Sequence, residues 1–377
     1  WDVEGRRYLD MMSAYSAVSF VHSHPRLVAA LTDQAGRLAL TSRAYSNDRL
    51  PLMLERLSAL LGYDRALPVN TGLEAVETAL QAARKWAHTI KGVPDGQAEI
   101  IVCDNNFHGR STTIISFSSE AQYRNGFGPL TPGFRSIPFG DADALAAAIT
   151  PRTAAFLFEP IQGEGGIVIP PPGWLARCAE ICRANGVLLI ADEVQTGLGR
   201  TGRLLACQHE DVRPDGVILG KALGGGLLPV AAFLADDALM QVFQPGDHGS
   251  TFGGNPLAAA VAAESLALLA EDRLTERSAT LGALFLARLQ AIDNPLIVEV
   301  RGRGLMIGME LDTRRVPARV AAEWMLARGL MTKDTHDKVL RFAPPLIVTE
   351  IELDWAARAI EDALTDLARR FPAGDAP

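Results

Sequence analysis

The most constraining feature of the sequence is the stretch from Val187 to Val230, where two short apolar runs each lead to an ionisable residue. Residues 187–191 are β-branched, leucine and alanine residues, which predict a buried strand, and Asp192 follows at once. Residues 216–219 form a second such run, followed by Gly220, Lys221 and a group of glycines. Because ligands of open α/β sheets bind at the carboxyl ends of the strands, we expect the acid and the amine at a binding edge.

This pair of residues indicates one cofactor in particular. Pyridoxal phosphate needs a lysine amine for a Schiff base and an acid beside its ring nitrogen. Taken singly, Asp192 is also consistent with a helix cap and Lys221 with a solvated loop lysine. Their occurrence on successive strand ends, within a glycine-rich frame, favours the cofactor site.

A wider set of segments carries a family resemblance over essentially the whole chain. These segments are SAYSAV, TSRAYSN, VNTGLEAVETA, ARKW, GFGPLTPGF, EPIQGEGG, HGSTFGGNPLA and RFAPPL. They resemble the class III, fold-type I aminotransferases, and within that family the members that act on ornithine. The resemblance implies a pyridoxal-phosphate enzyme of the α/β class. Its large domain is expected to hold a mainly parallel seven-stranded sheet sandwiched by helices, beside a smaller α+β domain.

Composition excludes several other classes of protein. The 377 residues are 48% hydrophobic and carry a formal net charge of −8, which predicts two or three globular domains. The interspersed charges argue against a nucleic-acid partner, and the lack of a long apolar run argues against a membrane protein. The four cysteines form no CxxC pair, so we expect reduced thiols in the cytoplasm.

Alternating strand and helix patterns predict the domain organisation. Strands are expected at residues 99–103, 112–117, 154–158, 187–191, 216–219 and 231–234, and a hairpin at residues 1–10. We expect an N-terminal segment (1–40) that packs with the small domain, a large cofactor-binding domain (41–270) and a small domain (271–377) ending in an irregular tail from Phe371. Because the chain starts at Trp1 and not at Met, we also expect residues upstream of it.

The resemblance assigns the cofactor contacts to Thr71, Gly72, Leu73, Phe107, His108, Asp192, Gln195, Lys221, Ser250 and Thr251. Asp192 would keep the ring nitrogen protonated, since an opposite charge favours the charged form. Residues 70–73 open a helix, whose backbone N–H groups suit a phosphate, although Thr71 is equally consistent with an ordinary N-cap. Phe107 would stack on the ring, and its alternative is a core position. The loop with Ser250 and Thr251 would reach the partner subunit's cofactor, which implies a homodimer with active sites at its interface.

The resemblance also implies the substrate contacts Tyr15, Arg110, Glu164 and Arg341. Arg110 would grip the α-carboxylate of ornithine in a bidentate fit, and Tyr15 would shape the pocket. Glu164 would mask Arg341 while ornithine reacts and would release it for 2-oxoglutarate or glutamate, so we count Glu164 with Lys221 and Asp192 as catalytic. In isolation, each of these charged residues is also consistent with a structural ion pair.

The implied reaction converts L-ornithine and 2-oxoglutarate to glutamate-5-semialdehyde, which cyclises to pyrroline-5-carboxylate, and glutamate. His108 stands where the ornithine enzymes often have Trp, which favours N-acetylornithine or another ω-amino acid as the alternative donor. A lyase or mutase would not need the Glu164–Arg341 pair, and a non-enzymatic protein would not need Asp192, Gln195 and Lys221. The His22-Ser23-His24 pair has no acid or Cys cluster beside it, so no metal is expected.

Overall fold

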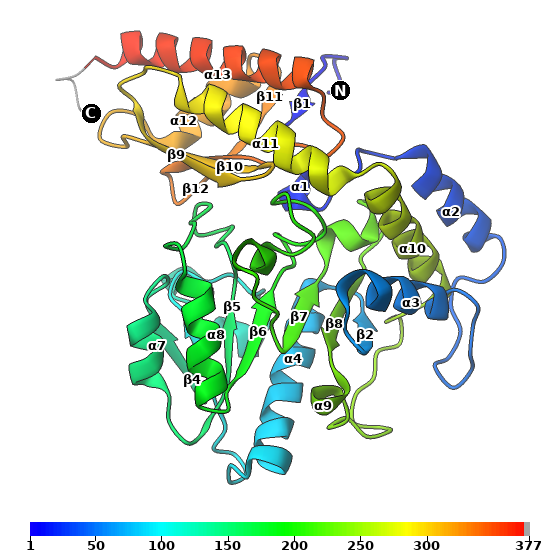
Figure 1. The fold of residues 1–377 in the computed structure, drawn as a ribbon. Helices are drawn as coiled ribbons and strands as arrows, with labels where there is room; N and C mark the ends of the chain where they lie inside the picture. Colours follow the sequence, from blue (N-terminus) through cyan, green and yellow to red (C-terminus); the bar gives the residue numbers. More distant parts are fainter. Residues whose placement is uncertain (373–377) are drawn as a thin grey trace.

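The computed structural model of the protein describes residues 1–372; the rest of the expected tail, 373–377, lies outside the described residues. Its main feature is a seven-stranded sheet in the order β2-β8-β7-β6-β5-β3-β4 (Figure 1). The strands are β2 (Arg65–Val69), β3 (Glu99–Cys103), β4 (Phe134–Ile137), β5 (Thr153–Phe158), β6 (Leu188–Asp192), β7 (Gly216–Leu219) and β8 (Ala231–Ala235). Strand β8 is antiparallel to both of its neighbours, and the other adjacent pairs are parallel, which confirms the expected mainly parallel sheet.

Helices cover both faces of this sheet because alternate residues of each strand point to opposite sides. On one face Ala155 and Leu157 of β5 belong to the core formed with helix α4 (Gly72–Trp86). On the other face Phe156 and Phe158 pack with Trp174 of helix α8 (Trp174–Ala184) and with helix α7 (Ala142–Ala148). The continuous apolar runs seen in the sequence are therefore strands that are buried on both sides.

A second sheet lies above the first in Figure 1 and belongs to the C-terminal part of the chain. Its order is β12-β13-β10-β9, all antiparallel, with β9 (Ile297–Arg303), β10 (Met306–Leu311), β12 (Lys333–Thr335) and β13 (Val339–Phe342). The accompanying helices are α11 (Leu274–Gln290), α12 (Ala318–Leu326) and α13 (Glu350–Arg370). Helix α10 (Pro256–Glu271) precedes α11 and packs against α2 (Pro25–Ala35) and α3 (Leu50–Leu61).

The N-terminal segment contacts both parts. Strand β1 (Leu9–Asp10) pairs in parallel with β11 (Leu330–Met331), and Ser19 accepts a backbone hydrogen bond from Leu346, whereas α2 packs on α10. We propose the division into residues 1–40, 41–270 and 271–377 on this basis.

Two of the predicted elements are not present in the structure, so these predictions are wrong. Residues 112–117 do not form a strand: Ser111 caps a short helix, α5 (Thr112–Ile115), by accepting from the backbone N–H of Ile114. A hydroxyl cap of this kind outweighs β-branched propensity over so short a run. Residues 1–10 are not a hairpin, because only β1 is a strand and it pairs with β11 in another part of the chain. Strands β2 and β4 were not predicted.

Two remaining sequence features have structural roles. His24 caps α2 through Nδ1, and His22 lies 2.9 Å from Asp10, so the two histidines serve different partners. Among residues 1–372, no helix combines the length and the apolar character needed to cross a membrane.

Candidate active site

The acid and the lysine at the two strand ends face one cavity. Asp192 is the last residue of β6 and pairs in register with Ile218 of β7, and Lys221 follows β7 after Gly220. The cavity has a volume of about 240 Å³. It is lined by Gly72, Leu73, Phe107, His108, Asp192, Gln195 and Lys221, among others. The sheet edge thus gathers seven of the ten expected cofactor contacts.

The carboxylate of Asp192 is buried and held from two sides. Its Oδ2 lies 2.6 Å from Nδ1 of His108, and its Oδ1 accepts from the backbone N–H of Val194 at 3.0 Å. Burial opposes the charging of His108, but the hydrogen bond and the negative charge of Asp192 outweigh it, so the pKa of His108 is raised. The contact with Asp192 therefore favours the protonated form of the His108 ring.

Lys221 combines an unusual backbone with an activated amine. Its φ of 43° lies in the left-handed region, which costs a non-glycine residue about 1–2 kcal/mol. Desolvation lowers the pKa of Lys221, in spite of the nearby carboxylates of Glu164, Asp192 and Glu159. A lowered pKa leaves more of the amine unprotonated at neutral pH, as a nucleophile requires.

The start of α4 presents free backbone donors to the same cavity. The Thr71 hydroxyl accepts from the backbone N–H of Glu74, whose carboxylate in turn accepts from the N–H groups of Asn70 and Thr71. Thr71 is therefore the N-cap and does not line the cavity. Within residues 1–372 nothing accepts from the N–H groups of Gly72 and Leu73, which is the arrangement that binds an anion. A Cβ on Gly72 would lie 3.0 Å from Val194, so only glycine fits there without a shift.

Phe107 is half-buried and does not belong to the core. It borders the first cavity and also a second one of about 510 Å³, which shares Lys221 with the first. Its backbone N–H donates to Glu159 at 3.0 Å. Burial and the charge of Asp192 raise the pKa of Glu159 to about 7, against the opposing effect of His108.

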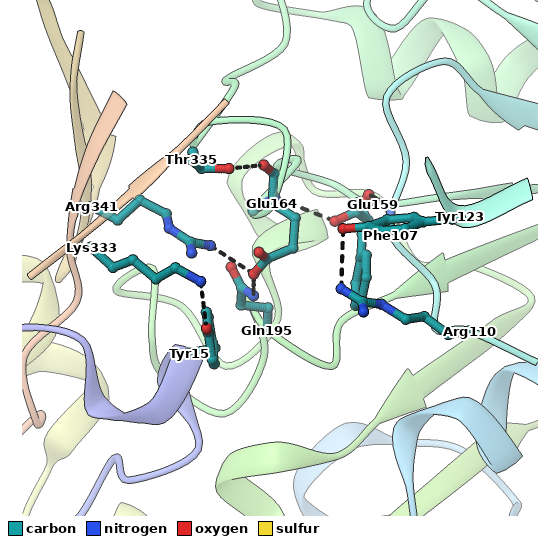
Figure 2. A network of polar contacts seen from close by, with 11 residues as sticks. Tyr15, Phe107, Arg110, Tyr123, Glu159, Glu164, Gln195, Lys333, Thr335 and Arg341 are labelled. Atoms are coloured by element: carbon teal, nitrogen blue, oxygen red, sulfur yellow. Dashed lines mark hydrogen bonds and ion pairs between the residues drawn. The ribbon is translucent and has the colours of Figure 1, made fainter. Parts of the chain in front are cut away.

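The second cavity contains an ion pair that joins the part of the chain with the seven-stranded sheet to the part with the four-stranded sheet (Figure 2). Arg341 of β13 donates to Glu164 at 2.7 Å, and Gln195 donates to the same carboxylate at 3.2 Å. The Thr335 hydroxyl donates to the backbone oxygen of Glu164 at 2.6 Å. Burial works against ionisation of Glu164, but Arg341 outweighs it and the pKa of Glu164 is lowered.

Tyr15 and Arg110 lie on opposite walls of the second cavity. Arg110 donates to the hydroxyl of Tyr123 at 3.1 Å and lies 4.3 Å from the centre of that ring. Tyr15 accepts from Nζ of Lys333 at 3.0 Å, and the Arg341 guanidinium lies 5.1 Å from its ring centre. All four expected substrate contacts therefore line one cavity, which ends at Lys221.

Ser250 and Thr251 do not line either of these cavities. The Ser250 hydroxyl accepts from the side chain of Asn70 at 3.1 Å and from the N–H of Gly253 at 3.0 Å. Thr251 lines a separate hollow of about 260 Å³, formed with Tyr45 and neighbouring residues.

Three residues at the site were not predicted from the sequence. Glu159 follows the last residue of β5, so the strand-end rule that identified Asp192 would have found it. Tyr123 lies in the short helix α6 (Ala121–Arg124) and Lys333 in strand β12, and nothing in the local sequence pattern marks either residue.

The first cavity fits pyridoxal phosphate. It offers an amine at Lys221 for which no hydrogen-bond acceptor is found among residues 1–372, an oriented carboxylate at Asp192 and the two free N–H groups of Gly72 and Leu73. Phe107 supplies an aromatic face. These are the groups that would hold an aldehyde, a ring nitrogen, a phosphate and a ring plane.

The chain is similar to known aminotransferases over almost its whole length. The ornithine aminotransferase of Bacillus subtilis is 55% identical over 96% of this chain and 90% of its own length. The crystal structure of the Toxoplasma gondii ornithine aminotransferase superposes with a TM-score of 0.97 at 44% identity, over 98% of this chain and 89% of that one. The acetylornithine aminotransferase of Elizabethkingia anophelis has a TM-score of 0.88, also at 44% identity, over 97% and 91%. The model of the Aminotransferase class-III family matches residues 1–364, and the chain belongs to this family of pyridoxal-phosphate-dependent enzymes.

Proposed function

We propose that the protein is an ornithine δ-aminotransferase, which transfers the δ-amino group of L-ornithine to 2-oxoglutarate. The observation that carries the proposal is the Glu164–Arg341 pair, at 2.7 Å, in the cavity that ends at Lys221. The names of the relatives that are 53–56% identical support the choice of donor. The products would be glutamate and glutamate-5-semialdehyde, which cyclises to pyrroline-5-carboxylate.

Each side chain of the first cavity would have a separate role in the amino-group transfer. When bound, pyridoxal phosphate supplies the electron sink for the carbanion that forms on the substrate. Lys221 would hold the cofactor and, once displaced, would move the proton from the substrate carbon that bears the reacting amine. Asp192, hydrogen-bonded to His108, would hold the proton on the ring nitrogen. Phe107 would fix the plane of the ring and exclude water from one face.

The Glu164–Arg341 pair would allow one cavity to bind two unlike substrates in turn, a diamino acid and a dicarboxylate. While ornithine reacts, Glu164 neutralises Arg341, and Arg110 on the far wall would take the α-carboxylate. Release of Arg341 would then provide a second guanidinium for a dicarboxylate. A lyase or a mutase, which handles one substrate, has no need of such a pair.

His108 does not favour the N-acetylornithine alternative. Its ring lines the first cavity, contacts Asp192 and does not line the second cavity, so it would not touch the distal end of a donor. The resemblance to an acetylornithine aminotransferase structure keeps that donor as the alternative to be tested.

We also propose a cytoplasmic homodimer. Tyr45 and Phe252 are 74% and 54% exposed, and Tyr45 lines the hollow that contains Thr251. Exposed aromatic side chains of this kind are typical of interfaces, and a partner there would place Ser250 and Thr251 beside another subunit. The four cysteines are buried free thiols, which supports a reducing compartment. Light scattering should give twice the chain mass of 40.4 kDa.

The deciding experiment is a half-reaction of the purified holoenzyme without any oxo acid. L-Ornithine should bleach the absorbance of the lysine-bound cofactor rapidly, and pyrroline-5-carboxylate should be trapped as the product. Bleaching by N-acetylornithine alone would make that compound the donor, and bleaching by neither would reject both.

A further inference from the structure

Two cations lie directly opposite each other in the small sheet. Lys333 of β12 pairs in register with Arg341 of β13 in the antiparallel ladder. Like charges in directly opposite positions destabilise a sheet. Both side chains extend into the second cavity (Figure 2). A local arrangement that works against folding, placed at a cavity wall, points to a functional requirement.

The charges of the two cations are balanced differently. Arg341 is buried and neutralised by Glu164. Lys333 has no carboxylate within ion-pairing distance among the described residues, and its ammonium donates to the hydroxyl of Tyr15 instead. Lys333 thus adds an uncompensated positive charge to the wall of the cavity.

This contact fixes the role of the Tyr15 hydroxyl. A phenolic oxygen that accepts a hydrogen bond from an ammonium has its own proton free for another partner. Tyr15 is therefore prepared to donate into the cavity, and the nearby charge of Lys333 strengthens that donation. A group that accepts from Tyr15 and is attracted by Lys333 is an anion, and a carboxylate has both properties.

We propose that Lys333 is a positioning residue for substrate specificity, which acts through Tyr15 on the carboxylate of 2-oxoglutarate or glutamate that the neighbouring Arg341 takes once Glu164 releases it. The inference rests on the proposed function, because the role of Tyr15 as a substrate contact does. It adds that Lys333 holds Tyr15 in its orientation and sets the direction of its hydrogen bond.

The test is a double-mutant cycle on the holoenzyme, with L-ornithine as the donor. Lys333→Met should raise the KM for 2-oxoglutarate about tenfold and change kcat less than about twofold, because a charge-assisted hydrogen bond to the bound oxo acid is lost. Tyr15→Phe should have a similar effect. The double variant Lys333→Met/Tyr15→Phe should be no worse than Tyr15→Phe alone, since Lys333 acts through the hydroxyl.

Two further variants separate positioning from structure. Lys333→Arg keeps a donor and a charge, so it should restore most of the affinity. Lys338→Met removes a lysine from the same hairpin that does not line the cavity, and it should leave both constants unchanged. If Lys333→Met proves unstable, Lys333→Ala in the wild-type and Tyr15→Phe backgrounds provides the same comparison, because it also removes the ammonium.

The outcomes distinguish this inference from the proposed function. If the wild-type protein does not react with ornithine, the proposed function fails, and the cycle is run with the ω-amino acid that does react. If the wild type reacts but the effects of Lys333→Met and Tyr15→Phe multiply, or if Lys333→Met lowers only kcat, the inference about Lys333 is rejected.

Discussion

Nδ1 of His108 lies 2.6 Å from Oδ2 of Asp192, and both side chains are almost fully excluded from water. Asp192, the acid that we propose to hold the ring nitrogen, is thus part of a buried pair with His108. A lone buried carboxylate would tend to take up a proton, and a neutral acid could not pair with a protonated ring nitrogen. We therefore propose that His108 holds Asp192 in place and puts a positive charge beside it, a role that its place in the sequence did not reveal.

Replacing His108 by Phe should weaken the hold on the cofactor. The ring volume is kept beside Phe117, but Asp192 loses its charged partner. We expect the dissociation constant of pyridoxal phosphate to rise at least tenfold, measured by cofactor release during dialysis. His88→Gln is the control, because within residues 1–372 that ring hydrogen-bonds only to the backbone oxygen of Val93 and lines neither cavity. Equal cofactor retention in the His108→Phe and His88→Gln proteins would contradict the role.

The raised pKa of Glu159 predicts how the stability of the folded protein changes with pH. Burial raises the pKa of this carboxyl to about 7 in the folded protein, whereas an unfolded chain would have a value of about 4.3. Between these values the folded state binds more protons than the unfolded state, so stability falls as the pH rises. The melting temperature of Glu159→Gln should fall less steeply than that of the wild type between about pH 4.5 and 7. Parallel curves for the two proteins would show that Glu159 is ionised throughout.

His108 acts in the same direction but at higher pH. Its folded pKa is raised, so the stability from the pair with Asp192 is fully present below about pH 6.5 and is lost as the pH rises through the folded value. The melting temperature of the apoenzyme should therefore decline above about pH 6.5. In His108→Phe this decline should be smaller, because Glu159 still titrates there but the pair with Asp192 is gone. A decline of the same size in both proteins would assign it to other groups.

Lys221→Ala should abolish both the colour and the turnover of the enzyme. No other amine lines the first cavity, so the absorbance of the lysine-bound cofactor should be lost and kcat should fall by at least about 10³-fold. Lys333→Ala provides a control in which another lysine of the adjoining cavity is removed. A Lys221→Ala protein that kept colour and turnover would refute the cofactor assignment.

The parts of the site that could be predicted from the sequence are those governed by strand ends. Asp192 and Lys221 follow apolar runs that could only be buried strands, and the parallel sheet delivers both to one edge. The substrate contacts depended on the family resemblance, because Tyr15 and Arg341 come from elements more than 300 residues apart.

Other features depend on tertiary structure and left no local signal. Helix α5 forms where a strand was expected because the Ser111 hydroxyl accepts a hydrogen bond from the backbone N–H of Ile114. Strand β1 depends on β11 for its hydrogen bonds, so the first ten residues could not be interpreted alone. Lys333 resembles any strand lysine until the register places it opposite Arg341.

Glu164→Gln should shift the balance between the two half-reactions. The amide cannot neutralise Arg341, so the guanidinium would be open to a carboxylate throughout the cycle. We expect the half-reaction with L-glutamate to gain at least about tenfold relative to that with L-ornithine, followed by the cofactor absorbance. Glu120→Gln is the matched control, because this acid also lines the cavity but lies 3.5 Å from His336 and does not contact Arg341. If Glu164→Gln and Glu120→Gln gave the same ratio of rates, Glu164 would not be the group that masks Arg341.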